Sequence, residues 1–87
     1  MNGFVYILKD ENGKLYIGST ENLDRRTKQH LSGHTQTTRN MRNPTLVFSQ
    51  KYGSLPEARK IEKKLKNLKR KDYIEKIVAD GYIKVTT

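Results

Sequence analysis

Two short apolar segments, each containing a tyrosine, flank the tripeptide Glu-Asn-Gly near the start of the sequence. They cover residues 4–8 and 15–18, and Tyr6 and Tyr16 lie ten positions apart. Strand-forming segments joined by a three-residue loop that ends in glycine are typical of a β-hairpin, because Gly13 can adopt the positive φ that closes such a turn. The sequence therefore predicts an antiparallel hairpin that carries both phenols.

The length of the turn decides which side chains share a face of this hairpin. A turn at residues 11–13 pairs Tyr6 with Gly18 and Leu8 with Tyr16, whereas a shorter Asn-Gly turn shifts the register by one residue and separates the tyrosines. We favour the first register because alternation along the strands then leaves one face purely aliphatic. One face carries Phe4, Tyr6, Leu8 and Tyr16, and the other carries Val5, Ile7, Leu15 and Ile17.

The rest of the chain alternates between helical and extended patterns. Caps, apolar periodicity and β-branched residues predict helices at residues 21–31, 55–68 and 72–79, a strand at residues 45–52, a basic loop at residues 34–44 and an extended segment at residues 82–85. The order ββαβαα predicts an α+β fold in which a small three-stranded antiparallel sheet is flanked by helices, as a single domain over residues 1–87.

Local signals also predict where these helices begin and which side chains they bury. Ser19 and Thr20 are expected to cap the first helix, and Ser54 with Glu57 forms a capping box for the second. The expected buried positions are Ala58, Ile61, Leu65 and Leu68 in the second helix, and Ile74, Ile77 and Val78 in the third.

Composition limits the class of partner and the compartment. Eighteen Lys and Arg residues against nine Asp and Glu residues give a formal net charge of +9, which favours a polyanion such as nucleic acid. There is no cysteine, which excludes disulfides and thiolate metal sites. No apolar stretch is long enough for a membrane span and no signal peptide is recognisable, so we expect a cytoplasmic protein.

Polar residues occupy two predicted helices at positions where apolar residues would pack better. Arg26 and His30 are four positions apart, so their side chains can reach the same point on the first helix. Taken alone, so short a pattern is far more often an ordinary half-exposed basic face. Glu62 falls within the expected buried stripe and is the only acidic residue in the basic stretch 59–71. An ion pair with Lys66 at i+4, worth about 0.2–0.5 kcal/mol, is the ordinary explanation for this carboxylate.

Taken together, these residues resemble the GIY-YIG nuclease superfamily, in particular its small members related to the N-terminal nuclease domain of an excision-repair endonuclease. The likeness rests on Phe-Val-Tyr at residues 4–6 for the first motif, Tyr-Ile-Gly at residues 16–18 for the second, residues 22–30 for the segment that supplies an arginine and a histidine, and Glu62 for the metal-binding glutamate. It spans residues 3–68, and the four pieces in this order are far more specific than any one alone.

The chain departs from the family pattern in three places. The first motif lacks its Gly-Ile and keeps only the tyrosine, and Ser19 stands where the excision-repair members carry a lysine. Ile74 lies near the position where some members have an asparagine. These departures concern ancillary positions and leave the principal motif residues intact.

The resemblance implies a phosphodiester hydrolase whose catalytic residues are Tyr6, Tyr16, Arg26, His30 and Glu62. Glu62 would bind one Mg²⁺ or Mn²⁺ ion, because Mg²⁺ is usually held by one or two carboxylates, its own waters and substrate phosphates. Arg26 would bind a phosphoryl oxygen. One tyrosine would be the general base, although only about one phenol in a thousand is ionised at neutral pH, so Arg26, the metal and His30 must assist. Whether that tyrosine is Tyr6 or Tyr16 stays open.

DNA is the partner that the resemblance implies, branched or damaged DNA included, with a role in DNA repair. The candidate nucleic-acid contacts are Gly18, which would leave space for the substrate backbone, and the basic residues Arg39, Arg42, Lys63 and Lys66. No small-molecule cofactor and no membrane are expected. The prediction is a metal-dependent DNA endonuclease; the alternatives are a non-catalytic nucleic-acid-binding module and a nuclease subunit that needs a protein partner for targeting.

Overall fold

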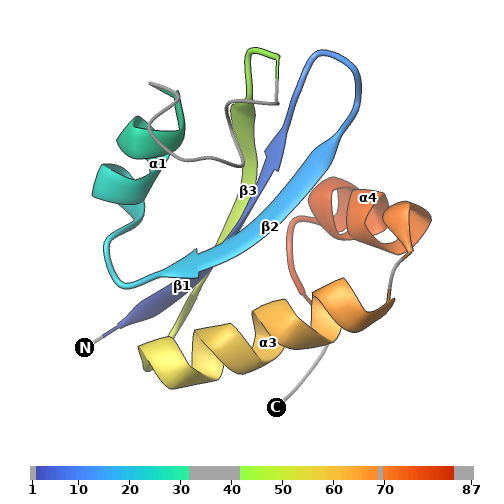
Figure 1. Cartoon of the computed structure of the whole chain (residues 1–87). Helices are drawn as coiled ribbons and strands as arrows, with labels where there is room; N and C mark the ends of the chain where they lie inside the picture. Colours follow the sequence, from blue (N-terminus) through green and yellow to red (C-terminus); the bar gives the residue numbers. More distant parts are fainter. Residues whose placement is uncertain (1, 32–41, 69, 84–87) are drawn as a thin grey trace.

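The computed structural model describes residues 2–31, 42–68 and 70–83, and this part of the chain folds around one sheet (Figure 1). In chain order its elements are β1 (Gly3–Lys9), β2 (Leu15–Thr20), α1 (Leu23–Leu31), β3 (Thr45–Tyr52), α3 (Leu55–Leu68) and α4 (Lys71–Asp80). The strands are antiparallel in the order β2-β1-β3, which makes β1 the central strand and β2 an edge. The predicted α+β class and ββαβαα order are confirmed.

The hairpin has the register that the sequence favoured. Tyr6 pairs with Gly18 and Leu8 pairs with Tyr16. Gly13 adopts a φ of 82°, which is the left-handed conformation that the turn requires and that glycine adopts without steric cost. Both tyrosines therefore project from the same face of the sheet, which fixes them as neighbours before any helix is added.

The carboxylate of Asp10 ties the hairpin turn to the chain that enters β3. Its Oδ1 accepts the backbone N–H groups of Asn12 at 2.9 Å and Lys14 at 2.7 Å. Its Oδ2 accepts the backbone N–H of Arg42 at 3.3 Å, and the N–H of Glu11 donates to the carbonyl of Arg42 at 2.9 Å. Three backbone donors thus converge on one buried carboxylate, which closes this end of the sheet.

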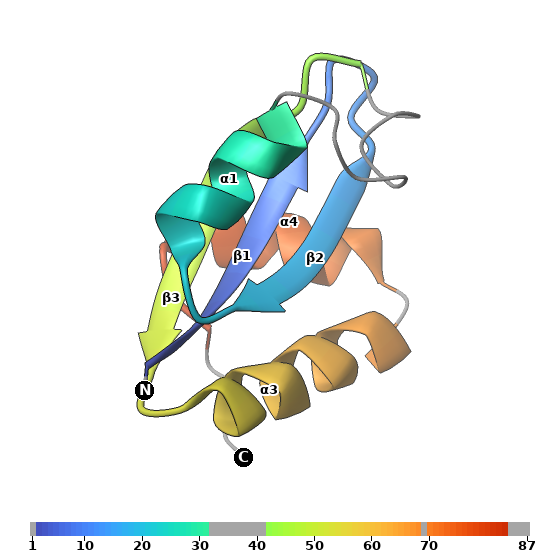
Figure 2. The same ribbon diagram turned by 60° about the vertical axis from the view of Figure 1, so that its left-hand side comes forward.

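The two faces of the sheet carry different kinds of side chain and are covered by different helices. Helices α3 and α4 bury the aliphatic face, whereas α1 lies across the tyrosine face (Figure 2). The larger core cluster contains Val5, Ile7, Ile17, Phe48, Ala58, Ile61, Leu65, Ile74, Ile77 and Ile83. The smaller cluster contains Tyr6 and Leu8, with Tyr16, Leu23 and Leu46 packed against them. Since a buried aliphatic side chain contributes about 1.5–3 kcal/mol, the larger cluster supplies most of the hydrophobic stabilisation.

Helix α1 begins at Leu23 rather than at residue 21, and its predicted cap was wrong. Ser19 and Thr20 belong to β2, because β2 stays paired with β1 as far as Thr20. Asn22 caps the helix instead, since its Oδ1 accepts the N–H of Arg25 at 3.0 Å. The side chain of Thr20 in turn accepts the N–H of Asn22 at 3.1 Å, which fixes the direction in which α1 leaves the strand.

Helix α3 follows its prediction except at its last turn. Ser54 Oγ accepts the N–H of Glu57 at 3.3 Å, which is the cap expected from the sequence. The side chains of Ala58, Ile61 and Leu65 are buried, but Leu68 is 42% exposed. The prediction that Leu68 is buried was therefore wrong, because periodicity places a residue on a face of a helix but does not show whether another element covers that end of the face.

Helix α4 covers the predicted segment, with a residue more at each end. Ile74 and Ile77 are buried, and Gly81 ends the helix in the left-handed conformation with its N–H donating to Ile77 O at 2.9 Å. Of the predicted extended segment, Tyr82 and Ile83 lie in the described part, and the N–H of Ile83 donates to Gln50 Oε1 at 2.7 Å. No helix among the described segments is long and apolar enough to cross a membrane.

Candidate active site

Tyr6 and Gly18 face each other across the β1–β2 pair. The side chain of Tyr6 is 1% exposed, and a Cβ atom at position 18 would lie 2.5 Å from Tyr6 Cζ, with the phenol oxygen even closer. Such contacts are far below van der Waals distance. The expectation that Gly18 leaves space for the substrate backbone is therefore corrected: the phenol of Tyr6 fills that space.

The hydroxyl of Tyr6 is hydrogen-bonded to Arg26, which α1 places over this face of the sheet. Burial raises the pKa of Tyr6 to about 12, although the Arg26 guanidinium acts in the opposite direction. The ring of Tyr16 lies beside it, with centroids 6.2 Å apart and an interplanar angle of 49°. Tyr6 is therefore a neutral phenol at physiological pH that can donate a hydrogen bond.

Arg26 connects the two tyrosines with the acidic residue from α3. Hydrogen bonding to Tyr6 raises the pKa of Arg26 above its usual value, and the nearby Glu62 carboxylate acts in the same direction. Its Nη1 donates to Gln29 Oε1 at 3.4 Å, while its buried Nε finds no hydrogen-bond partner within the described part of the chain. The guanidinium is thus fixed in place, permanently charged and incompletely satisfied, as expected of a group that binds an anion.

Glu62 reaches the same region from α3, on the other side of the sheet. Its Oε1 accepts a hydrogen bond from Ser19 Oγ, and its Oε2 lies 2.6 Å from Lys66 Nζ. The carboxylate side chain is 20% exposed, so it is held in place but remains accessible. The predicted i,i+4 pair of Glu62 and Lys66 is present, and Lys66 Nζ also lies 5.6 Å from the centroid of the Tyr16 ring.

The contact made by Ser19 was missed at the sequence level. Ser19 was interpreted as a helix cap, whereas strand alternation puts it on the same face as Leu15 and Ile17, toward α3. That alternation was the signal that could have identified it as a partner of Glu62. The edge strand β2 therefore contributes to the site from both faces, with Tyr16 and Gly18 on one and Ser19 on the other.

The donor set around Glu62 is suited to a hard divalent cation that keeps most of its waters. One partly exposed carboxylate with an adjacent hydroxyl matches the way Mg²⁺ is bound through one or two carboxylates and substrate phosphate. Within residues 2–31, 42–68 and 70–83, no group of three or more His, Cys, Asp or Glu residues could form an all-protein metal cage. The residues present fit a single ion of this kind and not a structural metal centre.

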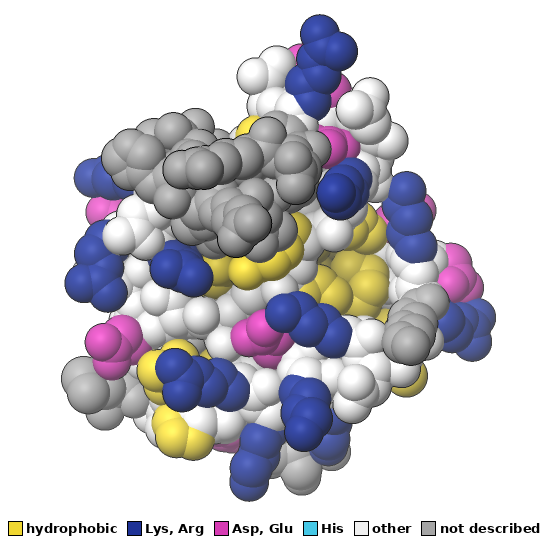
Figure 3. Space-filling view, viewed as in Figure 1, with side chains coloured by type: hydrophobic (Ala, Val, Ile, Leu, Met, Phe, Trp, Pro, Cys, Tyr) yellow, Lys and Arg dark blue, Asp and Glu magenta, His cyan; other side chains and the backbone are white. Residues whose placement is uncertain are grey.

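Basic side chains surround this carboxylate. Figure 3 shows Lys and Arg side chains gathered around an acidic one on the face formed by β2 and α3. One shallow depression is lined by residues that include Arg25, Arg26 and Arg59, and a second is lined by Arg59, Glu62, Lys63, Lys66 and Asn67. Arg59, which the sequence did not single out, therefore adjoins both depressions.

The structure brings together some predicted site residues and not others. The backbone of His30 lies in α1, but its side chain is outside the described residues, as is the whole of Arg39. Arg42 lies on the chain that enters β3 and contacts the hairpin turn, where its Nε lies 3.6 Å from Glu11 Oε2. The described site therefore consists of Tyr6, Tyr16, Arg26 and Glu62, with the additional contact from Ser19.

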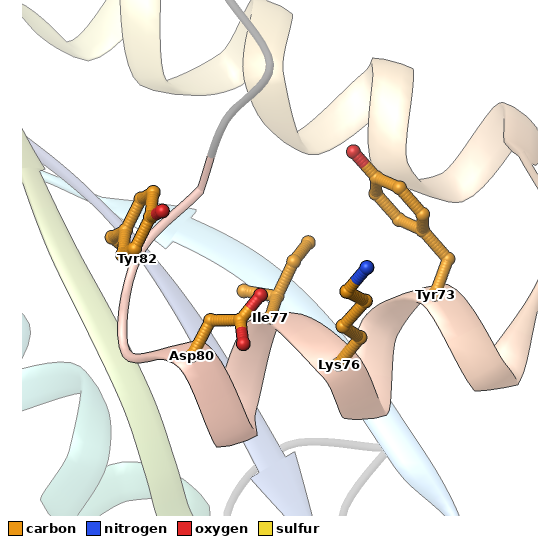
Figure 4. A pocket seen from close by; sticks show the side chains of 5 residues that line it. All are labelled: Tyr73, Lys76, Ile77, Asp80 and Tyr82. Atoms are coloured by element: carbon orange, nitrogen blue, oxygen red, sulfur yellow. The ribbon is translucent and has the colours of Figure 1, made fainter.

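Another hollow lies apart from these residues, on α4. It is lined by Tyr73, Lys76, Ile77, Asp80 and Tyr82, which come from α4 and the chain directly after it (Figure 4). No predicted site residue contributes to it. The presence of the predicted site residues therefore distinguishes the β2 edge from this hollow.

Comparison with known proteins agrees with this arrangement. The profile of the GIY-YIG catalytic domain matches residues 2–76. The chain belongs to the GIY-YIG family. The predicted resemblance is thus confirmed.

Several UPF0213 proteins are similar to this chain. The UPF0213 protein YhbQ of Escherichia coli K12 is 35% identical over 79 residues, covering 90% of this chain and 78% of that protein. The UPF0213 protein BH0048 of Halalkalibacterium halodurans is 39% identical over 72 residues, covering 82% and 77%. The solution NMR structure of the UPF0213 protein BH0048 from Bacillus halodurans superposes with a TM-score of 0.59 at 35% identity, covering 93% of this chain and 87% of that one.

Membership of the GIY-YIG family implies nuclease-type activity with DNA as substrate, and nucleases of this family generally use divalent metals. The arrangement of Arg26 and Glu62 around two phenols is chemically consistent with that class of reaction, because phosphodiester hydrolysis requires both a cation on the phosphate and a way to activate water.

Proposed function

We propose that this protein is a metal-dependent endonuclease that hydrolyses phosphodiester bonds in DNA at the β2 edge. The observation that supports it most directly is the meeting of Arg26 and Glu62 at Tyr6 and Tyr16. These four side chains come from four different elements, and the contacts that link them are a Tyr6–Arg26 hydrogen bond and the influence of Glu62 on Arg26. An ion-pair network that served stability alone would not require two adjacent phenols.

In this proposal Arg26 binds a non-bridging oxygen of the scissile phosphate, and its fixed guanidinium stabilises the charge that develops there. Glu62, oriented by Ser19, holds a single Mg²⁺ or Mn²⁺ ion. When bound, such an ion supplies charge neutralisation at the phosphate and makes water easier to deprotonate. Affinity is proposed to come from basic residues, namely Lys63 and Lys66 beside Glu62 together with Arg39 and Arg42 of the predicted basic loop, with steep salt dependence.

The two tyrosines take different roles in this proposal. Tyr6 is buried and its pKa is raised to about 12, so it stays a neutral phenol whose oxygen accepts a hydrogen bond from Arg26 and positions the guanidinium. Tyr16 is half-buried on the edge strand and is the more accessible of the two phenols, so it is proposed as the general base, with His30 accepting its proton. Replacing Tyr16 by Phe should therefore lower the cleavage rate about 10²–10⁴-fold and cost more than the same change at Tyr6; a larger loss for Tyr6→Phe would reverse the assignment.

The decisive experiment is cleavage of a panel of substrates with Mg²⁺ or Mn²⁺: supercoiled plasmid, linear duplex, single strands, branched DNA and RNA. Glu62→Gln removes the proposed ion-binding charge, and Glu75→Gln, on an exposed position of α4, removes the same charge elsewhere. Metal-dependent cutting should persist in Glu75→Gln and disappear in Glu62→Gln, with circular dichroism unchanged in both.

Normal cutting by Glu62→Gln would eliminate the metal assignment. If the unaltered protein binds DNA in a salt-sensitive way but cuts nothing in the panel, the protein is a binding module or a subunit that depends on a partner. Restoration of cutting by an added protein fraction would distinguish the second of these from the first.

A further inference from the structure

Both carboxylate oxygens of Glu62 are already engaged. Oε1 accepts the hydrogen bond from Ser19, and Oε2 lies 2.6 Å from the ammonium nitrogen of Lys66. A divalent ion that binds this carboxylate must therefore compete with one of these partners. Lys66 is the one that can leave, because its side chain is 48% exposed and sits on a flexible stem, whereas Ser19 is fixed in the edge strand.

We propose that Lys66 is a positioning residue that occupies the ion site in the free protein and moves to the DNA backbone when the ion binds. This inference rests on the proposed function and concerns how the same site is controlled. In the free protein the ammonium neutralises Glu62 and weakens its affinity for a divalent ion. In the DNA complex a phosphodiester takes over as the partner of the ammonium, and Glu62 becomes available to the ion.

The electrostatics of the site favour such an exchange. If a divalent ion binds Glu62 while Lys66 has no other anion nearby, the ion, the Lys66 ammonium group and the Arg26 guanidinium all lie near one carboxylate. Like charges at this range repel one another. A phosphate group relieves the repulsion, since Lys66 and Arg59 line the same depression as Glu62. Ion and DNA binding are therefore positively coupled, and the coupling must act equally in both directions.

The Lys66 ammonium group already lies close to the ring of Tyr16. Lys66 Nζ lies 5.6 Å from the ring centroid, within the range of a cation–π contact. Tyr16 is also the proposed general base, so a phosphate bound by Lys66 would lie beside the phenol. The displacement of Lys66 would thus bring the substrate to the residue that acts on it.

The test measures binding of Mn²⁺ to the protein alone, from the electron paramagnetic resonance signal of free Mn²⁺. Lys66→Met keeps most of the aliphatic stem and removes the charge, and Lys66→Arg keeps the charge. Lys63→Met is the matched control, because Lys63 lines the same depression but the ion pair with Glu62 is made by Lys66. Lys66→Met should bind Mn²⁺ about fivefold more tightly than the unaltered protein, as expected for loss of a partly exposed ion pair, and Lys63→Met less than about twofold. Lys66→Arg should stay close to the unaltered protein.

A second titration includes a short DNA duplex whose integrity is checked by gel electrophoresis. The duplex should strengthen Mn²⁺ binding by the unaltered protein, and Lys66→Met should lose most of this enhancement. Equal tightening in Lys66→Met and Lys63→Met would overturn the inference, because it would reflect net charge only. An enhancement by DNA that survives in Lys66→Met would overturn it as well.

Glu62→Gln separates this inference from the proposed function. If Glu62→Gln abolishes Mn²⁺ binding but Lys66→Met leaves it unchanged, the ion site stands and the role of Lys66 is wrong. If Glu62→Gln binds Mn²⁺ as tightly as the unaltered protein, the ion site itself is wrong and both proposals fail.

Discussion

The phenol of Tyr6 occupies the volume that a side chain at Gly18 would need on the neighbouring strand. The glycine is required because the tyrosine must lie flat across the edge strand for its hydroxyl to meet Arg26. A motif that carries Tyr-Ile-Gly on one strand and a tyrosine opposite the glycine on the next therefore describes a packing unit. The hairpin is thus part of the candidate active site and also its scaffold.

Gly18→Ala tests this packing unit. The added methyl group meets Tyr6 at distances that real Cβ atoms do not show, so either the ring or the strand must move. We expect a loss of about 1–3 kcal/mol in the free energy of unfolding, as for other overpacked sites, and a larger proportional loss of cleavage because Tyr6 is displaced from Arg26. Urea denaturation with a parallel cleavage assay measures both effects.

Gly53→Ala is the matched control for this substitution. A Cβ atom there would meet nothing closer than Glu57 Oε2, at 3.5 Å. Its stability should stay within about 0.5 kcal/mol of the unaltered protein. Combining Gly18→Ala with Tyr6→Leu should recover part of the loss if the clash is the cause, and strictly additive effects would show that it is not.

The ionisation of Tyr6 should weaken the fold at high pH. Below pH 10, the ordinary pKa of tyrosine, the phenol is protonated in both the folded and the unfolded chain, and its contribution to stability is complete. Between pH 10 and about 12 the unfolded chain loses this proton while burial keeps it on the folded protein, so the free energy of unfolding falls. The shift corresponds to about 2–3 kcal/mol by the upper end of this range.

Urea unfolding from pH 8 upward in Tyr6→Phe isolates this effect. The variant should lose the part of the alkaline decline that belongs to Tyr6, whereas Tyr82→Phe, at a position that is 52% exposed, should retain it. Deprotonation of the many lysines is common to all three proteins and cancels in the comparison. If the free energy of unfolding falls identically with rising pH in all three proteins, the burial of Tyr6 has no consequence for its ionisation.

Asp10 should have the opposite dependence on pH. Burial tends to raise the pKa of its carboxyl group, but the backbone N–H groups of Lys14, Arg42 and Asn12 outweigh burial and hold the pKa below its ordinary value. Its contribution to stability is therefore present above the pKa of the unfolded chain, near 3.8, and is lost as the pH falls through the lower pKa of the folded protein.

Asp10→Asn is expected to unfold at a lower temperature than the unaltered protein at pH 7 and to show a smaller decline in stability below pH 4. Asp24→Asn, on an exposed position of α1, serves as the control. The pKa of Asp72 is also lowered, mainly by its hydrogen bond with Arg70. Asp72 should therefore cause part of the loss of stability at acidic pH in every variant. An unchanged unfolding temperature in Asp10→Asn would show that the backbone contacts at the turn are dispensable.

The sequence predicted those parts of the fold that depend on local rules. Alternation and the position of Gly13 were sufficient for the hairpin register, and Ser54 with Glu57 was sufficient for the start of α3. The start of α1 was wrong, because the hairpin pairing continues past Gly18 and holds Ser19 and Thr20 in β2 against their local preference for a cap. The predicted register, extended by two residues, would have shown that Ser19 and Thr20 lie opposite Val5 and Phe4.

In the candidate site, too, the sequence predicted what depends on local patterns and missed what depends on the packing of separate elements. Motif spacing identified Tyr6, Tyr16, Arg26 and Glu62, and strand register already made the tyrosines neighbours. The i,i+4 spacing correctly predicted Lys66 as the partner of Glu62. The contact between Ser19 and Glu62 joins residues 43 positions apart in sequence, so it is a consequence of how α3 packs beside β2 and was not predicted.

Arg26 is expected to act on the reaction more than on the binding of DNA. Its guanidinium is held by Tyr6 and has a buried donor that remains unsatisfied within the described part of the chain, so it is prepared for charge that appears in the transition state. Arg26→Ala should lower the single-turnover cleavage rate about 10²–10³-fold and weaken DNA binding less than about tenfold. Arg25→Ala removes the same charge from the same depression but on an exposed side chain, so it should weaken binding and reduce its salt dependence while the single-turnover rate stays nearly unchanged. Equal losses of rate and affinity in the two variants would make Arg26 one more electrostatic contact, and the catalytic role would then have to be assigned to another group near Tyr16.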